Sequence, residues 1–122
     1  MKVPAFLLRR LFVKGSLQNT PGGFEFKLKN SLGSGYANGM LPLMVDGEEI
    51  PAETSTFSVD GKTLVFPEVT RESPATLAMN KEVTIAVQGR KLAPGPHKVN
   101  MGFIVTGLGE LRFDLVDSVT EG

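Results

Sequence analysis

The sequence of 122 residues contains no cysteine and no tryptophan, and it has one histidine, His97, and one tyrosine, Tyr36. Without cysteine there is no disulfide framework, no thiolate zinc site and no thiol nucleophile. A single histidine leaves a multi-histidine metal site or a Ser-His-Asp triad little to build from. We therefore predict no catalytic residue, no metal ligand and no cofactor in this chain.

An excess of charge of one sign is also missing, since 13 Lys and Arg residues face 13 Asp and Glu residues. Nucleic acids and anionic membranes select positive charge, so neither is expected as a partner. No apolar run reaches the roughly 20 residues of a membrane span. Arg9 and Arg10 interrupt the N-terminal apolar run too early for a signal peptide. These features predict a soluble, cytoplasmic protein.

What the sequence does contain is an alternation of apolar and polar residues, the pattern of strands with one buried face. Phe24, Phe26 and Leu28, for example, are separated by charged residues. Such alternation, together with shorter apolar runs, predicts seven strands, at residues 24–29, 41–45, 56–59, 63–66, 81–88, 99–105 and 111–115.

Turn residues lie between these segments. Asp46-Gly47 and Asp60-Gly61 are strong hairpin signals, because both residue types tolerate positive φ. Pro21-Gly22-Gly23 and Pro94-Gly95-Pro96 predict two further turns. We predict one all-β domain over residues 1–122, an antiparallel β-sandwich of about eight strands, with a small partly open β-barrel as the alternative.

Three segments do not follow this pattern clearly. Residues 6–13 are apolar enough for a strand covered on both faces, which we favour, but a short amphipathic helix or a partner-docking arm is also open. Ser73 to Asn80 has the start of one or two helical turns, with Ser73 as a cap and a proline next to it. Asn30 to Met40 reads as a glycine-rich loop of about ten residues.

His97 is the one side chain that titrates near neutral pH. As a functional residue it would be a proton shuttle or a ligand contact, and as a structural one it would pack at the sheet edge and bond a turn. We favour the structural role. An enzyme would require His97 with a carboxylate beside it in a pocket. The acidic residues at 48–49, 68–72 and 114–117 fit solvated turns or outward strand positions better than a glycosidase pair or a calcium loop.

The Asn30 to Met40 segment is the strongest candidate for binding, because long loops on compact β domains are often functional. An exposed tyrosine among small polar residues suits contact with a protein or a sugar. The residues that we expect to contact a partner or ligand are Ser34, Tyr36, Asn38, Met40, Phe6 and His97.

Several motifs, in order along the chain, resemble the small β subunits of bacterial C-glycoside deglycosidases. They are Leu17-Gln18-Asn19-Thr20-Pro21-Gly22-Gly23-Phe24-Glu25-Phe26, Val45-Asp46-Gly47-Glu48-Glu49-Ile50-Pro51, Phe57-Ser58-Val59-Asp60-Gly61-Lys62 and Leu92-Ala93-Pro94-Gly95-Pro96-His97-Lys98-Val99. Together these motifs cover about residues 16 to 105.

The resemblance implies a non-catalytic β-sandwich subunit of a carbon–carbon lyase acting on sugar derivatives. It also implies a larger α/β-barrel catalytic subunit as partner, which would hold a divalent metal. The alternative from the residues alone is a free-standing module, homo-oligomeric when isolated, that binds a glycan or peptide through the 30–40 loop.

Overall fold

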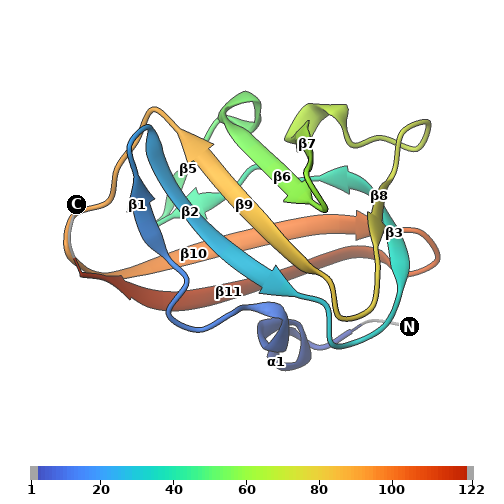
Figure 1. Cartoon of the computed structure of the whole chain (residues 1–122). Helices are drawn as coiled ribbons and strands as arrows, with labels where there is room; N and C mark the ends of the chain where they lie inside the picture. Colours follow the sequence, from blue (N-terminus) through green and yellow to red (C-terminus); the bar gives the residue numbers. More distant parts are fainter. Residues whose placement is uncertain (1–2, 121–122) are drawn as a thin grey trace.

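The computed structural model describes residues 3–120, which form two antiparallel β-sheets packed face to face (Figure 1). One sheet has the strand order β1 (Gln18–Thr20), β2 (Gly23–Lys29), β9 (Glu82–Gln88), β6 (Ser55–Val59) and β7 (Lys62–Val65). The second has the order β5 (Glu48–Glu49), β4 (Met44–Val45), β10 (Gly95–Val105), β3 (Gly35–Met40) and β8 (Ala75–Leu77), with β11 (Gly109–Val119) on the other side of β10. The predicted all-β sandwich is confirmed.

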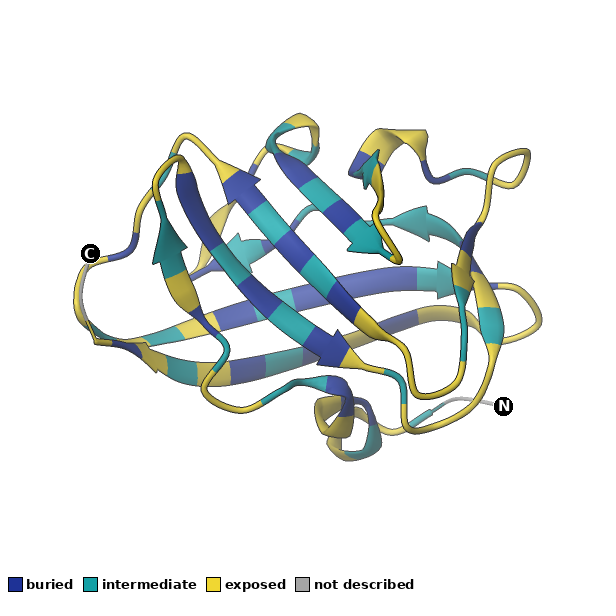
Figure 2. Cartoon of the chain, viewed as in Figure 1, coloured by how far each residue is buried: buried dark blue, intermediate teal, exposed yellow. Residues whose placement is uncertain are grey.

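The core lies between the sheets and is built from the alternating positions. Figure 2 shows buried residues recurring along β2, β9, β10 and β11. Phe24, Phe26 and Ile85 are completely buried where β2 pairs with β9. Phe103 and Phe113 meet edge to face in the opposite sheet, with ring centroids 6.5 Å apart. The period-two pattern therefore predicted both the strands and the faces that they bury.

Both Asp-Gly hairpins are confirmed. Asp46 and Asp60 adopt positive φ angles of 52° and 50°, and each is followed by a glycine that also has positive φ. The first hairpin joins β4 to β5 and the second joins β6 to β7. These turns leave the strands in register without an extra residue.

The strand that we favoured for residues 6–13 is wrong. The segment forms a short helix, α1 (Ala5–Leu8), followed by a 3₁₀ turn, η1 (Arg9–Leu11). Helical spacing places Leu8 and Leu11 on one face, and both are buried against the core. Only Phe12 continues in extended form, where it bridges Leu28 of β2.

The structure corrects two predictions, the loop at Asn30 to Met40 and the helix at Ser73 to Asn80. Residues 35–40 form β3, and residues 75–77 form β8, which pairs with it. Composition hid β3 because it carries two glycines and little apolar surface. β3 is a strand because β10 and β8 satisfy its backbone groups from either side. Two further 3₁₀ turns, η2 (Ala52–Thr54) and η3 (Phe66–Glu68), complete the elements.

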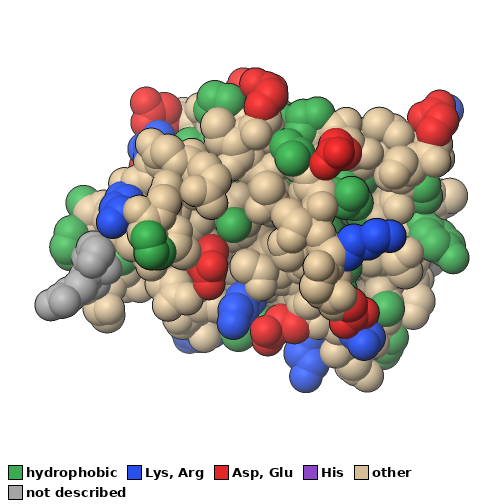
Figure 3. Space-filling model, turned by 45° about the horizontal axis from the view of Figure 1, so that its top comes forward, with side chains coloured by type: hydrophobic (Ala, Val, Ile, Leu, Met, Phe, Trp, Pro, Cys, Tyr) green, Lys and Arg blue, Asp and Glu red, His purple; other side chains and the backbone are tan. Residues whose placement is uncertain are grey.

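The surface carries charges of both signs. Figure 3 shows acidic and basic side chains interspersed over the face it presents, without a broad field of either sign. Across residues 3–120, no helix is long and apolar enough to cross a membrane.

Candidate functional site

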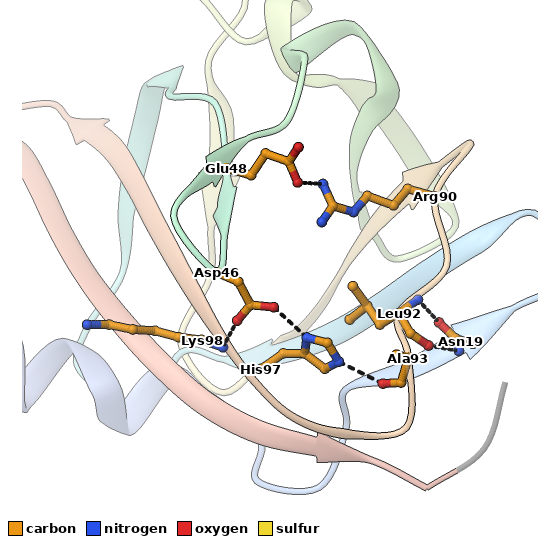
Figure 4. A network of polar contacts seen from close by, with 8 residues as sticks. All are labelled: Asn19, Asp46, Glu48, Arg90, Leu92, Ala93, His97 and Lys98. Carbon is orange, nitrogen blue, oxygen red and sulfur yellow. Dashed lines mark hydrogen bonds and ion pairs between the residues drawn. The ribbon is translucent and has the colours of Figure 1, made fainter.

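His97 lies near the start of β10 and has a partner at each ring nitrogen (Figure 4). Its Nδ1 is 2.6 Å from Oδ2 of Asp46 in the β4–β5 turn, and its Nε2 is 2.7 Å from the carbonyl oxygen of Ala93. The other carboxylate oxygen of Asp46 accepts a hydrogen bond of 2.9 Å from the backbone N–H of Lys98. The histidine side chain is only 13% exposed.

This geometry favours the protonated form of the ring. A carbonyl oxygen and an ionised carboxylate accept hydrogen bonds, so the imidazolium form of His97 can donate from both ring nitrogens at once. The Ala93 carbonyl, and then the Asp46 carboxylate, raise the pKa of His97. The Lys98 N–H, and then His97, lower the pKa of Asp46. The two directions agree, because each group stabilises the charge of the other.

The 89–94 loop, which contains Ala93, is held at two further points, shown in Figure 4. The side-chain amide of Asn19 donates to the Leu92 carbonyl and accepts from the Leu92 N–H, both at 2.8 Å. Arg90 forms an ion pair of 2.7 Å with Glu48. We call this set (Asn19, Asp46, Glu48, Arg90, Leu92, Ala93, His97 and Lys98) the polar clamp. It holds the 89–94 loop, which carries the chain from β9 in one sheet to β10 in the other.

The carboxylate that an enzyme would need beside His97 is thus present. However, neither His97 nor Asp46 lines the cavity between the sheets or the hollow over β3 that are described below. A protonated ring with both nitrogens engaged has no lone pair with which to accept a substrate proton. The predicted structural role of His97, bonding a turn at the sheet edge, agrees with this geometry.

A hollow, here called the outer hollow, lies on the outer face of the second sheet, and it combines a few polar side chains with a mainly apolar lining. Tyr36 and Asn38 project outward from β3, while Ala37 between them is buried. Asn38 donates to the hydroxyl of Thr106 at 3.1 Å, and Arg71 reaches the same hollow from the loop before β8. Tyr36 is 54% exposed. Tyr36 and Asn38 are thus two predicted contact residues that lie together.

The other predicted contact residues lie apart from this hollow. Ser34 and Met40 line an apolar cavity between the sheets, on the inner side of β3. Phe6 projects from α1 and is 63% exposed. His97 lies in the polar clamp at the far end of β10. The structure therefore divides the six predicted residues among four places.

The acidic pair at Asp114 and Asp117 anchors the N-terminal segment. Asp114 forms an ion pair of 2.7 Å with Arg9 and one of 3.3 Å with Lys98. Asp117 accepts hydrogen bonds from the backbone N–H groups of Gly15 and Leu17. Among residues 3–120, no three His, Asp or Glu side chains are grouped as a metal site requires.

Sequence reasoning missed Asp46, Asn19, Arg71 and Thr106 as members of these sites. The sequence places Asp46 in a hairpin turn and a weak calcium-loop pattern, and neither indicates that its carboxylate accepts hydrogen bonds from His97 and Lys98. The pairing of His97 with a residue 51 positions away depends on β4 lying beside β10. No local signal contains that information.

Comparison with protein families gives a match over most of the chain. The family described as hydroxymethylglutaryl-CoA reductase, N-terminal domain, matches residues 7–120. The chain belongs to this family. Comparison with the curated proteins finds no match. The family match covers the second half of α1, both sheets and every residue of the polar clamp.

The resemblance to C-glycoside deglycosidase β subunits was wrong, because the family match assigns the same residues to a reductase domain. The lyase function and the α/β-barrel partner subunit are wrong with it. A family of N-terminal domains does not fit the free-standing module either. The motifs misled because they are turn sequences, such as Asp46-Gly47 and Pro94-Gly95, which any β-sandwich uses. The absence of a cofactor in this chain stays a prediction.

Proposed function

We propose that this chain is a non-catalytic domain of a hydroxymethylglutaryl-CoA reductase-type protein, and that it acts through contact rather than chemistry. The observation that carries this proposal is that both ring nitrogens of His97 are engaged. Nδ1 contacts the Asp46 carboxylate and Nε2 contacts the Ala93 carbonyl, so neither nitrogen is free to reach a substrate. General acid–base catalysis would need a proton donor or acceptor that can reach a substrate.

An activity assay tests the first half of the proposal. The purified chain is incubated with hydroxymethylglutaryl-CoA and a reduced nicotinamide cofactor, and oxidation of the cofactor is followed by absorbance. We expect no turnover above the rate without protein. Turnover that is lost in His97→Gln, while circular dichroism shows that the variant is folded, would overturn the proposal.

For the contact surface we propose the outer hollow around Tyr36, Asn38 and Arg71. Among the described residues, Arg71 forms no ion pair, although it is exposed. Tyrosine and arginine are the side chains that most often dominate binding energy at the centre of an interface. A guanidinium without a partner, next to an exposed aromatic ring, supports contact with an acidic surface of the remaining reductase.

Calorimetric titration of the chain with the catalytic part of a reductase of this family tests the contact surface. We expect Tyr36→Ala and Arg71→Glu each to weaken binding by about tenfold or more. Glu53→Ala, an exposed change on η2, is the control and should bind like the unchanged chain. Binding that is equal in all variants would place the contact elsewhere, and no binding at all would remove it.

A further inference from the structure

An apolar cavity of about 460 Å³ opens between the two sheets, at the end of the sandwich opposite the polar clamp. Leu7, Leu8 and Leu11 close it from one side, and the 30–34 loop lies at its mouth. Phe57 contributes from the first sheet and Phe103 from the second, so the cavity reaches into the core. Figure 1 shows β3 close to the β10–β11 hairpin at this end, while α1 lies below β11.

The chemistry of the lining is uniform. Among residues 3–120, Asn30 and Ser34 are its only polar side chains, and none of the described lining residues is charged. Asn30 is fully occupied, since its amide donates to the carbonyls of Gly33 and Leu77 and its oxygen accepts from two backbone N–H groups. The hydroxyl of Ser34 accepts from the Met79 N–H, and its own proton has no partner among the described residues. One hydrogen-bond donor therefore remains at an otherwise apolar mouth.

The volume is that of a ligand site and not of imperfect packing. Protein interiors are packed as densely as organic crystals, with few voids larger than a water molecule. An engineered cavity of about 150 Å³ lined by apolar side chains stays dry and binds benzene, and the volume here is about three times larger. Ligand pockets in general span about 300 to 1,000 Å³.

Gly35 shows where the space lies. A Cβ atom placed on Gly35 would meet nothing closer than Cγ1 of Val105, at 3.7 Å. At the rim, Leu32 and Leu108 are 41% and 38% exposed, so the mouth is apolar as well as the interior. A guest that entered between them would cover both side chains.

We propose that this cavity binds an uncharged, mainly aliphatic molecule, with its chain between the sheets and one acceptor oxygen near the Ser34 hydroxyl. An ionised carboxylate is selected against, because burying a charge without a partner is costly and the described part of the lining offers no cation. The site is separate from the proposed contact surface, which lies on the outer face of β3.

Binding is measured with the neutral fluorescent probe N-phenyl-1-naphthylamine, which brightens in apolar surroundings, and its displacement by decanol or decanoate. We expect the chain to bind the probe, and decanol to displace it at concentrations about tenfold or more below those of decanoate. A folded chain that does not bind the probe, or equal displacement by both compounds, would overturn the proposal.

Two variants with a matched control test the location. Gly35→Leu should fill the cavity and weaken probe binding by about tenfold or more. Thr76→Leu adds the same side chain to the exposed face of the neighbouring strand β8, and should leave probe binding unchanged. Equal probe binding by the two variants would place the probe elsewhere.

Ser34→Ala keeps the proposal testable if Gly35→Leu does not fold. It should weaken decanol binding several-fold while leaving the probe, which has no acceptor oxygen, unaffected. Unchanged decanol binding in folded Ser34→Ala would overturn the role of the hydroxyl. None of these results depends on the activity assay or on the titration with the reductase, so the two proposals fail independently.

Discussion

The two ends of the sandwich are built in opposite ways, and β10 runs from one to the other. At its start, His97 and its neighbours close the end with directional hydrogen bonds to named atoms. At its finish, Phe103 and Val105 face a cavity that apolar side chains surround but do not fill. Directional hydrogen bonds fix the structure of one end, whereas the other end is loosely packed.

This difference indicates which end of the fold tolerates structural rearrangement. Hydrogen bonds to a charged partner lose their stabilisation when either partner moves, so the polar clamp permits only one arrangement of the 89–94 loop. Apolar contacts around a cavity are fewer for each side chain, so rearrangement there costs less. We therefore expect the polar end to be the more rigid end and the cavity end to be the one that adapts to a guest.

The largest expected effect compares two buried leucines. Leu43 is 0% exposed and directly precedes β4, outside the cavity lining, whereas Leu8 is 2% exposed and lines the cavity. Leu43→Ala should lower the free energy of unfolding by about 3–5 kcal/mol, and Leu8→Ala by about 2–3 kcal/mol. Leu8 borders existing empty space and so has fewer contacts to lose.

Urea denaturation followed by circular dichroism measures both values. The decisive quantity is the difference between two chemically identical truncations, which removes most of the uncertainty in either one. A larger loss for Leu8→Ala than for Leu43→Ala would mean that the cavity end is the better packed end.

A smaller effect is expected at Asn19, within the polar clamp. Asn19→Ala removes the partners of both the N–H and the carbonyl of Leu92, a buried residue. Unpaired buried polar groups cost about 1–3 kcal/mol, and we expect a loss of this size. Gln18→Ala is the control, because Gln18 bonds only the exposed Glu25 carboxylate. If the two variants are equally stable, Asn19 does not anchor the loop.

The strands of this fold were predictable where the chain alternates strictly. Phe24, Phe26 and Leu28 carry enough apolar surface on one face to identify β2 without any tertiary information. β3 was not predictable, because a strand with two glycines forms only where neighbouring strands supply its hydrogen bonds. The prediction for the N-terminal segment failed for another reason. Its apolar residues fit both the strand period and the helix period, and packing against the core favours the helix.

The candidate sites were predicted less well than the fold. The preference for a structural His97 came from composition and position, but its partner Asp46 becomes visible only when β4 is placed beside β10. The inferred family resemblance was wrong because it rested on turn motifs, which reflect local backbone geometry and indicate little about function. The cavity has no sequence signal at all, since its lining residues are the ordinary apolar positions of the strands.

The smallest expected effect is the pH dependence of the stability that the polar clamp provides. No titrating side chain is among the described residues that line the cavity, so that end should show no such dependence. The pKa of His97 is raised above its usual 6.5, so its contribution to stability is complete below about that pH and is lost as pH rises through the folded-state value. The pKa of Asp46 is lowered below 3.8, so its contribution is present above that pH and is lost as pH falls through the folded-state value. The pair therefore stabilises most between about pH 4 and pH 6.5.

We expect the stability difference between the unchanged chain and His97→Gln to be largest in that window and to shrink as the solution becomes alkaline. Urea denaturation at a series of pH values measures it. Asn19→Ala serves as the control, because it weakens the same loop without removing a titrating group, and its deficit should be independent of pH. A His97→Gln deficit that grows with rising pH would show that the ring is neutral in the folded chain. The charged, doubly engaged histidine that supports a non-catalytic domain would then have to be abandoned.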